Sequence, residues 1–250
     1  MDALGPPRLP VPARMLRPVC DETRGFRFSV REILISLIFL FIVRPFVETT
    51  WGRLTEAVLY SLVLLSTLVA VGARRRELLL GFVLILPALT FRWLSHLLSL
   101  SQNDPLPLIC LTLAFSFTIW QLLRFVMHAR QVNLDVLCAG ISVYLLLGQV
   151  WGYFYLLVDR FVPGSFLFPG LSSHPTSLRP DVAFYFSMCT ITTAGYGDII
   201  PASPQARTLA TLESTTGVLY VAVLLAQLVA MRKAGHAQSQ RSDGDSIRAA

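Results

Sequence analysis

The fold of this chain is decided by the stretch Thr190-Ile191-Thr192-Thr193-Ala194-Gly195-Tyr196-Gly197-Asp198. The aromatic-rich run before it, Asp181 to Cys189, predicts a short helix that leads into a loop. The long apolar run after it, Leu209 to Met231, predicts a helix that crosses a membrane. A short helix, a glycine-bearing loop and a long apolar helix, in this order, indicate a pore.

The loop can offer backbone oxygens to a cation that has left water. A run of carbonyls turns to one side only where the backbone takes unusual angles, and Gly195 and Gly197 permit those angles because neither has a Cβ. We expect the carbonyls of residues 193–196 to line the path of the ion, with the Thr193 hydroxyl at its inner end. The candidate ion-binding residues are Thr193, Ala194, Gly195, Tyr196 and Gly197.

Aromatic and acidic side chains are expected to support the loop from behind. We expect Tyr196 to point away from the ion and to pack against Phe184, Tyr185 and Phe186. Asp198 either hydrogen-bonds behind the loop or adds negative charge at its outer mouth. The candidate supporting residues are Asp198, Thr192, Phe184, Tyr185 and Glu213.

The short helix has recognisable ends. Pro180 followed by Asp181 predicts its start, because proline suits the first helical position and an acid favours the positive end of the helix. Its carboxyl-terminal end carries partial negative charge. We expect that end to stabilise a cation in the inner cavity.

The stretch resembles the signature of potassium-selective channels, which usually has Val where this chain has Ala194. The pattern is specific, since ordinary residue frequencies give Thr-Thr-x-Gly-Tyr-Gly-Asp by chance in about one of 10⁵ chains of this length or fewer. The resemblance covers residues 181–231 closely and is nearest to small prokaryotic six-span channels. It implies passive conduction of K⁺, with four copies of the chain completing the filter around an axis.

Two alternatives stay open at this point. A poorly selective cation channel is possible because Ala194 removes two methyl groups from the packing behind the filter. A non-conducting membrane subunit could keep the loop for assembly with another pore chain. No HExxH or GxSxG pattern and no metal-ligand spacing of cysteines is present, so we expect neither an enzyme nor a cofactor, with K⁺ as the permeating ion.

The composition is that of an all-α integral membrane protein, with 54% apolar residues, 14% charged residues and a mean hydropathy of +0.61. Six apolar runs approach or reach the roughly 20 residues that a bilayer-crossing helix needs. The first run is short and carries Arg44, so it is the weakest span. The six runs are Ile33–Val47, Ala57–Ala73, Leu78–Leu100, Leu106–Val126, Val136–Val158 and Leu209–Met231.

The basic residues predict the orientation. With the amino terminus in the cytoplasm, fifteen basic residues fall on the inner side and five on the outer side, as positive-inside insertion requires. Both termini are then cytoplasmic and the filter loop is outside. We expect a multi-pass protein of the plasma membrane, or of the cell inner membrane if the source is bacterial, with lipid and its own copies as partners, no nucleic acid, and a regulatory partner that stays unknown.

The predicted organisation has four parts. They are a flexible basic arm (1–31), a four-helix membrane region (32–131), a pore domain (132–231) and a short cytoplasmic tail (232–250). The pore domain comprises a helix (136–158), a turret (159–179), the pore helix (181–192), the filter (193–198) and the inner helix (208–231).

The four-helix region is not a recognisable voltage sensor. Its fourth span has no arginine from Leu106 to Leu123, so we expect weak or no voltage dependence. Arg92 and His96 share one face of the third span. They serve either packing at the membrane interface or gating by protons.

The last span carries two features of interest. Glu213 is an acid in an apolar helix, so we expect it to accept hydrogen bonds behind the filter or to be protonated. Gly217 is either a gating hinge, as in the inner helices of the family, or a point of close helix contact. The pattern of Glu213, Gly217, Tyr220 and Ala222 is similar to the inner helices of small prokaryotic potassium channels.

Overall fold

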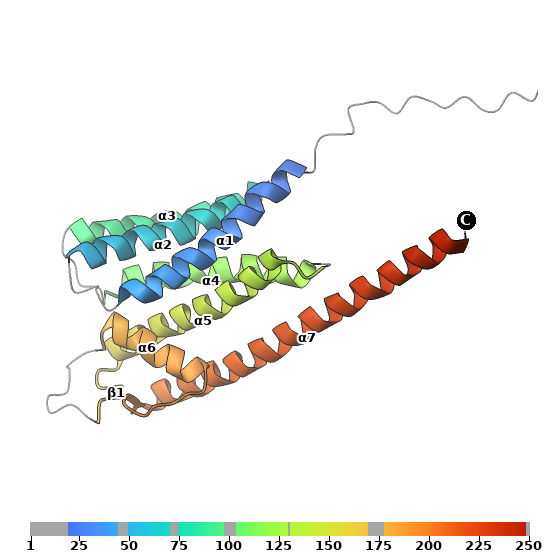
Figure 1. The fold of residues 1–250 in the computed structure, drawn as a ribbon. Helices are drawn as coiled ribbons and strands as arrows, with labels where there is room; N and C mark the ends of the chain where they lie inside the picture. Colours follow the sequence, from blue (N-terminus) through green and yellow to red (C-terminus); the bar gives the residue numbers. More distant parts are fainter. Residues whose placement is uncertain are drawn as a thin grey trace, which may run out of the picture.

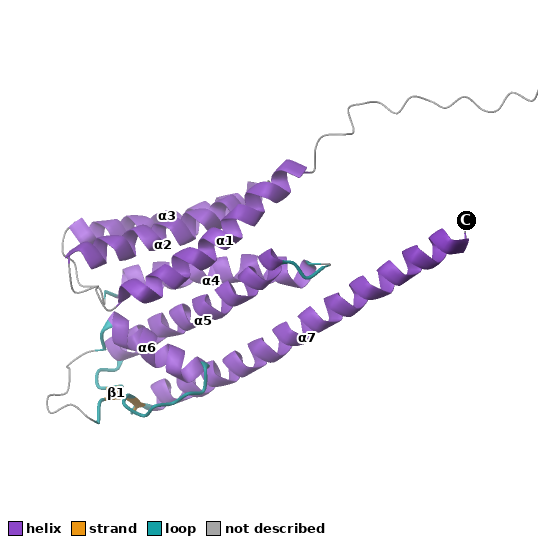
Figure 2. Ribbon diagram, viewed as in Figure 1, coloured by secondary structure: helices purple, strands orange, loops and turns teal. Residues whose placement is uncertain are grey.

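A computed structural model of the chain describes residues 20–44, 50–70, 75–97, 104–129, 131–169 and 178–248. The described chain is almost wholly helical (Figures 1 and 2). The helices are α1 (Cys20–Val43), α2 (Thr50–Ala70), α3 (Arg75–Leu97), α4 (Pro105–His128), α5 (Leu134–Phe161), α6 (Pro180–Ile191) and α7 (Pro204–Arg248). Two short strands, β1 (Phe166–Leu167) and β2 (Ile200–Pro201), pair antiparallel.

Each of the six predicted apolar runs overlaps one helix, and residues 45–47, 71–73 and 98–100 of the first three runs lie outside the described chain. Among the described residues, four helical segments are long and apolar enough to cross a membrane, and Leu54–Leu68 in α2 is a shorter apolar helix. The four segments are Arg76–Leu94, Pro105–His128, Leu134–Phe161 and Pro204–Lys233. The prediction of an all-helical membrane protein is therefore confirmed.

The structure differs from the sequence expectation at both ends of the chain. The flexible arm predicted for residues 1–31 is helical from Cys20 on, and the short tail predicted from residue 232 continues α7 as far as Arg248. Residues 20–31 and 232–248 contain no proline, the residue that most strongly breaks a helix. Residues 1–19 lie outside the described chain.

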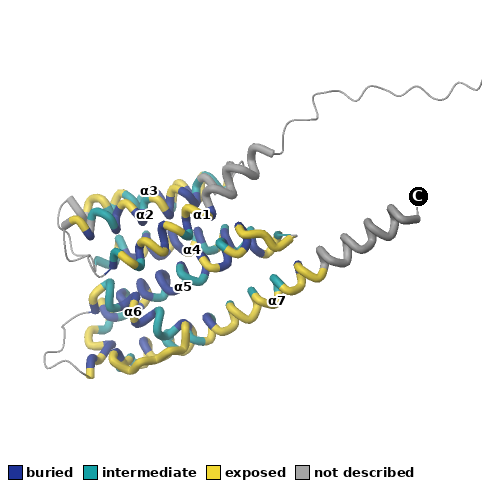
Figure 3. Tube along the Cα trace, in the orientation of Figure 1, coloured by how far each residue is buried: buried dark blue, intermediate teal, exposed yellow. Residues whose placement is uncertain are grey.

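The helices α1 to α5 pack into one bundle whose core is apolar (Figure 3). Ion pairs tie neighbouring helices together along its sides. Arg31 of α1 pairs with the buried Asp135 of α5 at 2.8 Å, and Arg124 of α4 pairs with Glu77 of α3. Because α1 contacts α5 directly, the first part of the chain lies against the segment that leads to the predicted filter.

Candidate functional site

The helix before the loop, α6, spans Pro180–Ile191, which is within one residue of the predicted bounds 181–192. Pro180 is at its first position and Asp181 lies in its first turn. At the other end, the amides of Ala194 and Gly195 both donate to the carbonyl of Cys189, at 2.9 and 3.2 Å. The loop therefore turns back over the end of α6 and satisfies a carbonyl that the helix leaves free.

The backbone of the loop alternates in handedness. Thr193, Gly195 and Gly197 have positive φ angles of 59°, 54° and 79°, whereas Ala194 and Tyr196 between them do not. A Cβ added at either glycine would meet nothing within 4 Å, so conformation and not crowding explains the glycines. A β-branched residue in the left-handed region is strained by about 1–2 kcal/mol, and such strain is common at functional sites.

Tyr185 connects α6 to the loop from behind. Its hydroxyl donates to Asp198 Oδ2 at 2.8 Å, and its ring stacks on that of Tyr196 with centroids 6.5 Å apart. Tyr185 therefore contacts the loop at two residues, Tyr196 and Asp198.

Phe184 and Phe186 do not join this stack. Phe184 packs edge-on against Phe41 of α1, and Phe186 packs against Tyr155 and Phe166. The reason is helical geometry: consecutive residues point about 100° apart, so only one of the three aromatic side chains can face the loop. Thr192, the remaining candidate support, donates its hydroxyl to the Met188 carbonyl at 2.7 Å.

Glu213 of α7 is completely buried behind α6. One carboxyl oxygen contacts the Tyr155 hydroxyl and the other contacts the hydroxyl of Ser187, which also lies 2.7 Å from the carbonyl of Gly148. Ser187 has one hydroxyl proton for two oxygen neighbours, so a proton on Glu213 would make both contacts hydrogen bonds. The acid thus joins α5, α6 and α7 at one point.

Two glycines let α5 approach α6 closely. A Cβ on Gly152 would lie 3.3 Å from the backbone of Phe184, and one on Gly148 would overlap the sulfur of Met188. The two glycines are four residues apart, in the small-xxx-small pattern that packs membrane helices. Sequence reasoning missed this contact, although the stretch Gly148-Gln149-Val150-Trp151-Gly152 carries the signal.

Gly217 of α7 lies against the end of α6. A Cβ there would overlap the carbonyl oxygen of Ile191 and lie 2.7 Å from its Cγ1. There is no room for a side chain at this position unless α6 shifts, and α7 runs through Gly217 without interruption.

The two short strands pair beside the site. β1 follows α5 and β2 follows the loop, with Phe166 opposite Pro201 and Leu167 opposite Ile200. Asp159 accepts from the amide of Leu178 at 2.6 Å, which ties the end of α5 to the start of the α6 segment. Residues 170–177 of the predicted turret lie outside the described chain.

The loop is open within one chain. Residues 192–198 are all exposed, and Tyr196 is 73% exposed despite its stack. Among the other candidates, Arg92 pairs with Glu56 and lies over the ring of Tyr60, which favours the packing role for Arg92. The side chain of His96 lies outside the described residues.

Comparison with known proteins shows what this part of the chain is similar to. Residues 135–233 match a protein family described as ion channel, which is not an enzyme family. The chain is 40% identical over 65 residues to two-pore potassium channel 4 of Arabidopsis thaliana, covering 26% of this chain and 22% of that protein. It is 35% identical over 95 residues to two-pore potassium channel 1 of the same plant, covering 38% and 23%.

A bacterial relative matches a shorter segment. The chain is 54% identical over 41 residues to the inward rectifier potassium channel Kirbac3.1 of Paramagnetospirillum magnetotacticum, covering 16% of this chain and 14% of that protein. The matched segments thus span less than a quarter of each of these relatives. No solved structure matches the chain. The resemblance to the potassium-channel family is confirmed.

Proposed function

From this relationship to potassium channels, we propose that the chain forms a potassium-selective channel that conducts K⁺ passively. The observation that carries the proposal is the alternating backbone of the loop, with positive φ at Thr193, Gly195 and Gly197. Such alternation can turn successive carbonyl oxygens toward one side, where they replace the hydration shell of an ion. No cofactor takes part, and K⁺ is the cargo.

The proposed assembly is a homotetramer around a fourfold axis. One loop provides one side of an ion path, and a closed ring needs identical copies. Two features support this assembly: the loop is exposed in the single chain, and only 11% of an 18-residue apolar stretch of α7 is buried. In the assembly, α5, α6 and α7 surround the path, and Asp198 and Tyr185 hold the loop from behind.

We further propose six membrane crossings, made by α1 to α5 and α7, with α6 and its loop re-entering from the outer side. The distribution of basic residues supports cytoplasmic termini. The proposed location is the plasma membrane, or the inner membrane of a bacterial source.

The proposal is tested by K⁺ flux into liposomes that contain only this purified chain. We expect flux from the unchanged chain and its loss in Gly197→Ala, because an added Cβ is strained at φ 79°. Gly164→Ala is the matched control: Gly164 has φ 78°, also with nothing within 4 Å, but it lies outside the loop. Equal flux in both variants would contradict the proposal, and no flux from the unchanged chain would favour a non-conducting subunit.

Ala194 favours a second candidate, a channel that selects poorly between K⁺ and Na⁺. Alanine leaves less packing behind the loop than the valine usual in the family. Reversal potentials in mixed K⁺ and Na⁺ distinguish the two candidates. A low K⁺ preference that rises in Ala194→Val would establish the second one.

A further inference from the structure

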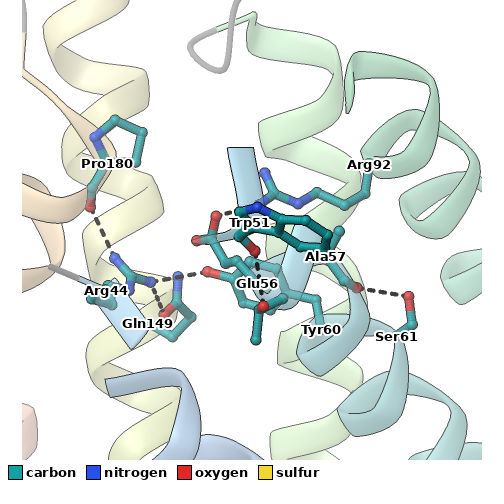
Figure 4. Close-up of polar contacts among 10 residues, drawn as sticks. Arg44, Trp51, Glu56, Ala57, Tyr60, Ser61, Arg92, Gln149 and Pro180 are labelled. Carbon is teal, nitrogen blue, oxygen red and sulfur yellow. Dashed lines mark hydrogen bonds and ion pairs between the residues drawn. The ribbon is translucent and has the colours of Figure 1, made fainter. Parts of the chain in front are cut away.

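A single buried arginine joins the first helices to the start of α6. Arg44 follows the last residue of α1 and is only 8% exposed. Its Nη1 donates to the carbonyl oxygen of Pro180 at 3.0 Å, and its Nη2 donates to the Tyr60 hydroxyl at 2.9 Å and to Gln149 Oε1 at 2.5 Å. Figure 4 shows these acceptors, one each from α6, α2 and α5, around the guanidinium.

These partners of Arg44 are neutral. Besides the three oxygens, the guanidinium lies over the ring of Phe184, with Cζ 4.0 Å from the ring centroid. A buried cation is costly unless hydrogen bonds and an aromatic face replace its water. Because the guanidinium is planar and its donors point in fixed directions, it holds the three helices in one relation.

The residues that Arg44 touches on α6 adjoin the support of the loop. Pro180 and Phe184 lie in the first turns of α6, and Tyr185 is the next residue. Tyr185 stacks on Tyr196 and donates to Asp198. A shift of the start of α6 would therefore move Tyr185, which contacts the loop at Tyr196 and Asp198.

We propose that Arg44 is a positioning residue for the ion-binding loop and that, through it, the first helices set the selectivity of the pore. The inference rests on the proposed channel function. In this proposal the four-helix region acts on the pore through a direct contact with the first turns of α6, and this role requires no charged sensor helix.

The chain offers a matched control in Arg92 of α3. Arg92 is also largely buried, with 12% of its side chain exposed, and it forms an ion pair with Glu56 of α2. Its Cζ lies 5.2 Å from the centroid of Tyr60, the residue whose hydroxyl accepts from Arg44. Glu56 and Tyr60 both belong to α2, so these contacts tie Arg92 to the first helices.

The experiment compares Arg44→Gln, Arg44→Lys and Arg92→Gln in the full chain, reconstituted in liposomes. The first measurement is the ratio of K⁺ to Na⁺ flux. Arg44→Gln should lower this ratio about tenfold, the effect of losing charge-assisted hydrogen bonds. Arg44→Lys should lower the ratio less, because lysine keeps the positive charge but lacks the planar guanidinium with its fixed donor directions. Arg92→Gln should stay within about twofold of the unchanged chain.

The second measurement is the rise in Tm on replacing Na⁺ by K⁺, which reports ion binding by the loop whether or not ions pass. Arg44→Gln should lose most of this rise, and Arg92→Gln should keep it. A lower Tm in both salts with the rise intact would mean that Arg44 is merely structural, and would overturn the proposal. A ratio of K⁺ to Na⁺ flux in Arg44→Gln equal to that in Arg92→Gln would also overturn the proposal.

Two further outcomes are separable. If Arg44→Gln does not fold, Phe184→Leu removes the ring beneath the guanidinium and should change the flux ratio and the K⁺-dependent rise in the same direction. If the unchanged chain passes no K⁺, the proposed function fails, and the K⁺-dependent rise in Tm still decides whether Arg44 positions the loop.

Discussion

The helices α5 and α7 are similarly apolar, and in the sequence α5 precedes the loop and α7 follows it. The rest of the chain buries α5 much more than α7. In an 18-residue apolar stretch of each helix, 56% of α5 is buried but only 11% of α7. The helices α1, α4 and α6 of the same chain cover α5, whereas α7 extends beyond its neighbours with most of its surface open (Figure 3). Contacts within the chain therefore fix α5, whereas the open surface of α7 is left for lipid or other copies of the chain.

What α7 does share with its own chain lies along one stripe. Glu213, Gly217, Tyr220 and Leu224 are spaced four, three and four residues apart, which places them on one face of a helix. Three of these side chains contact α5 or α6, and Gly217 abuts the end of α6. Substitutions along this stripe should therefore destabilise the chain more than substitutions on the open side of α7.

The largest effect is expected at Glu213. Glu213→Ala leaves the hydroxyls of Tyr155 and Ser187 without the carboxyl and opens a cavity, so we expect about 3 kcal/mol of lost stability. Glu213→Gln should cost about 1 kcal/mol or less, because an amide both donates and accepts, like a protonated carboxyl. Unfolding in detergent measures both. Thr211→Ala, on the exposed side of α7, is the control, and an equal loss there would contradict this account.

The next effect is expected at Gly217. Gly217→Ala forces a methyl group against the Ile191 carbonyl, a backbone atom that cannot turn away, and should cost about 2 kcal/mol. Gly140→Ala is the matched control on α5, because the atoms nearest to its Cβ would belong to the side chain of Leu224, 3.1 Å away, which can move. Thermal unfolding compares the two variants. Equal stability with altered channel opening would instead favour the hinge.

The loop and Glu213 show which parts of the site the sequence predicts and which it does not. The loop could be predicted because its chemistry is local: Gly195 and Gly197 allow positive φ, and Pro180 marks the helix before them. The partners of Glu213 could not, because Ser187 and Tyr155 are 26 and 58 residues away in the chain. Only packing brings them together.

Arg44 illustrates a different limit. In the sequence it is a basic residue at the end of a short apolar run, which reads as a mark of the membrane edge. In the structure it is buried against α2, α5 and α6. Hydropathy and the positive-inside rule describe the membrane but not neighbouring helices, so neither could identify its contacts.

A smaller effect is expected at Tyr220. Its hydroxyl donates to the Gly140 carbonyl at 2.7 Å, and its ring stacks on Tyr144 with centroids 6.1 Å apart. Tyr220→Phe keeps the stack and removes the hydrogen bond, so the loss should be about 0.6–1 kcal/mol, as for other hydrogen bonds between membrane helices. Tyr144→Phe should cost less, since its bond to Ile191 is longer at 3.3 Å. Unfolding measurements that reverse this order would contradict the prediction.

The smallest effect on the stability of a single chain is expected at exposed positions of α7 outside the stripe. Leu219 on α7 and Val83 on α3 are 57% and 64% exposed, so Leu219→Ala and Val83→Ala should each change unfolding by about 0.5 kcal/mol or less. If copies of the chain cover α7 while lipid covers α3, only Leu219→Ala should lower the tetramer fraction on dilution, because every copy loses the same contact. Native mass spectrometry measures that fraction. Equal fractions in the two variants would mean that lipid covers both faces, and the low burial of α7 would then say nothing about assembly.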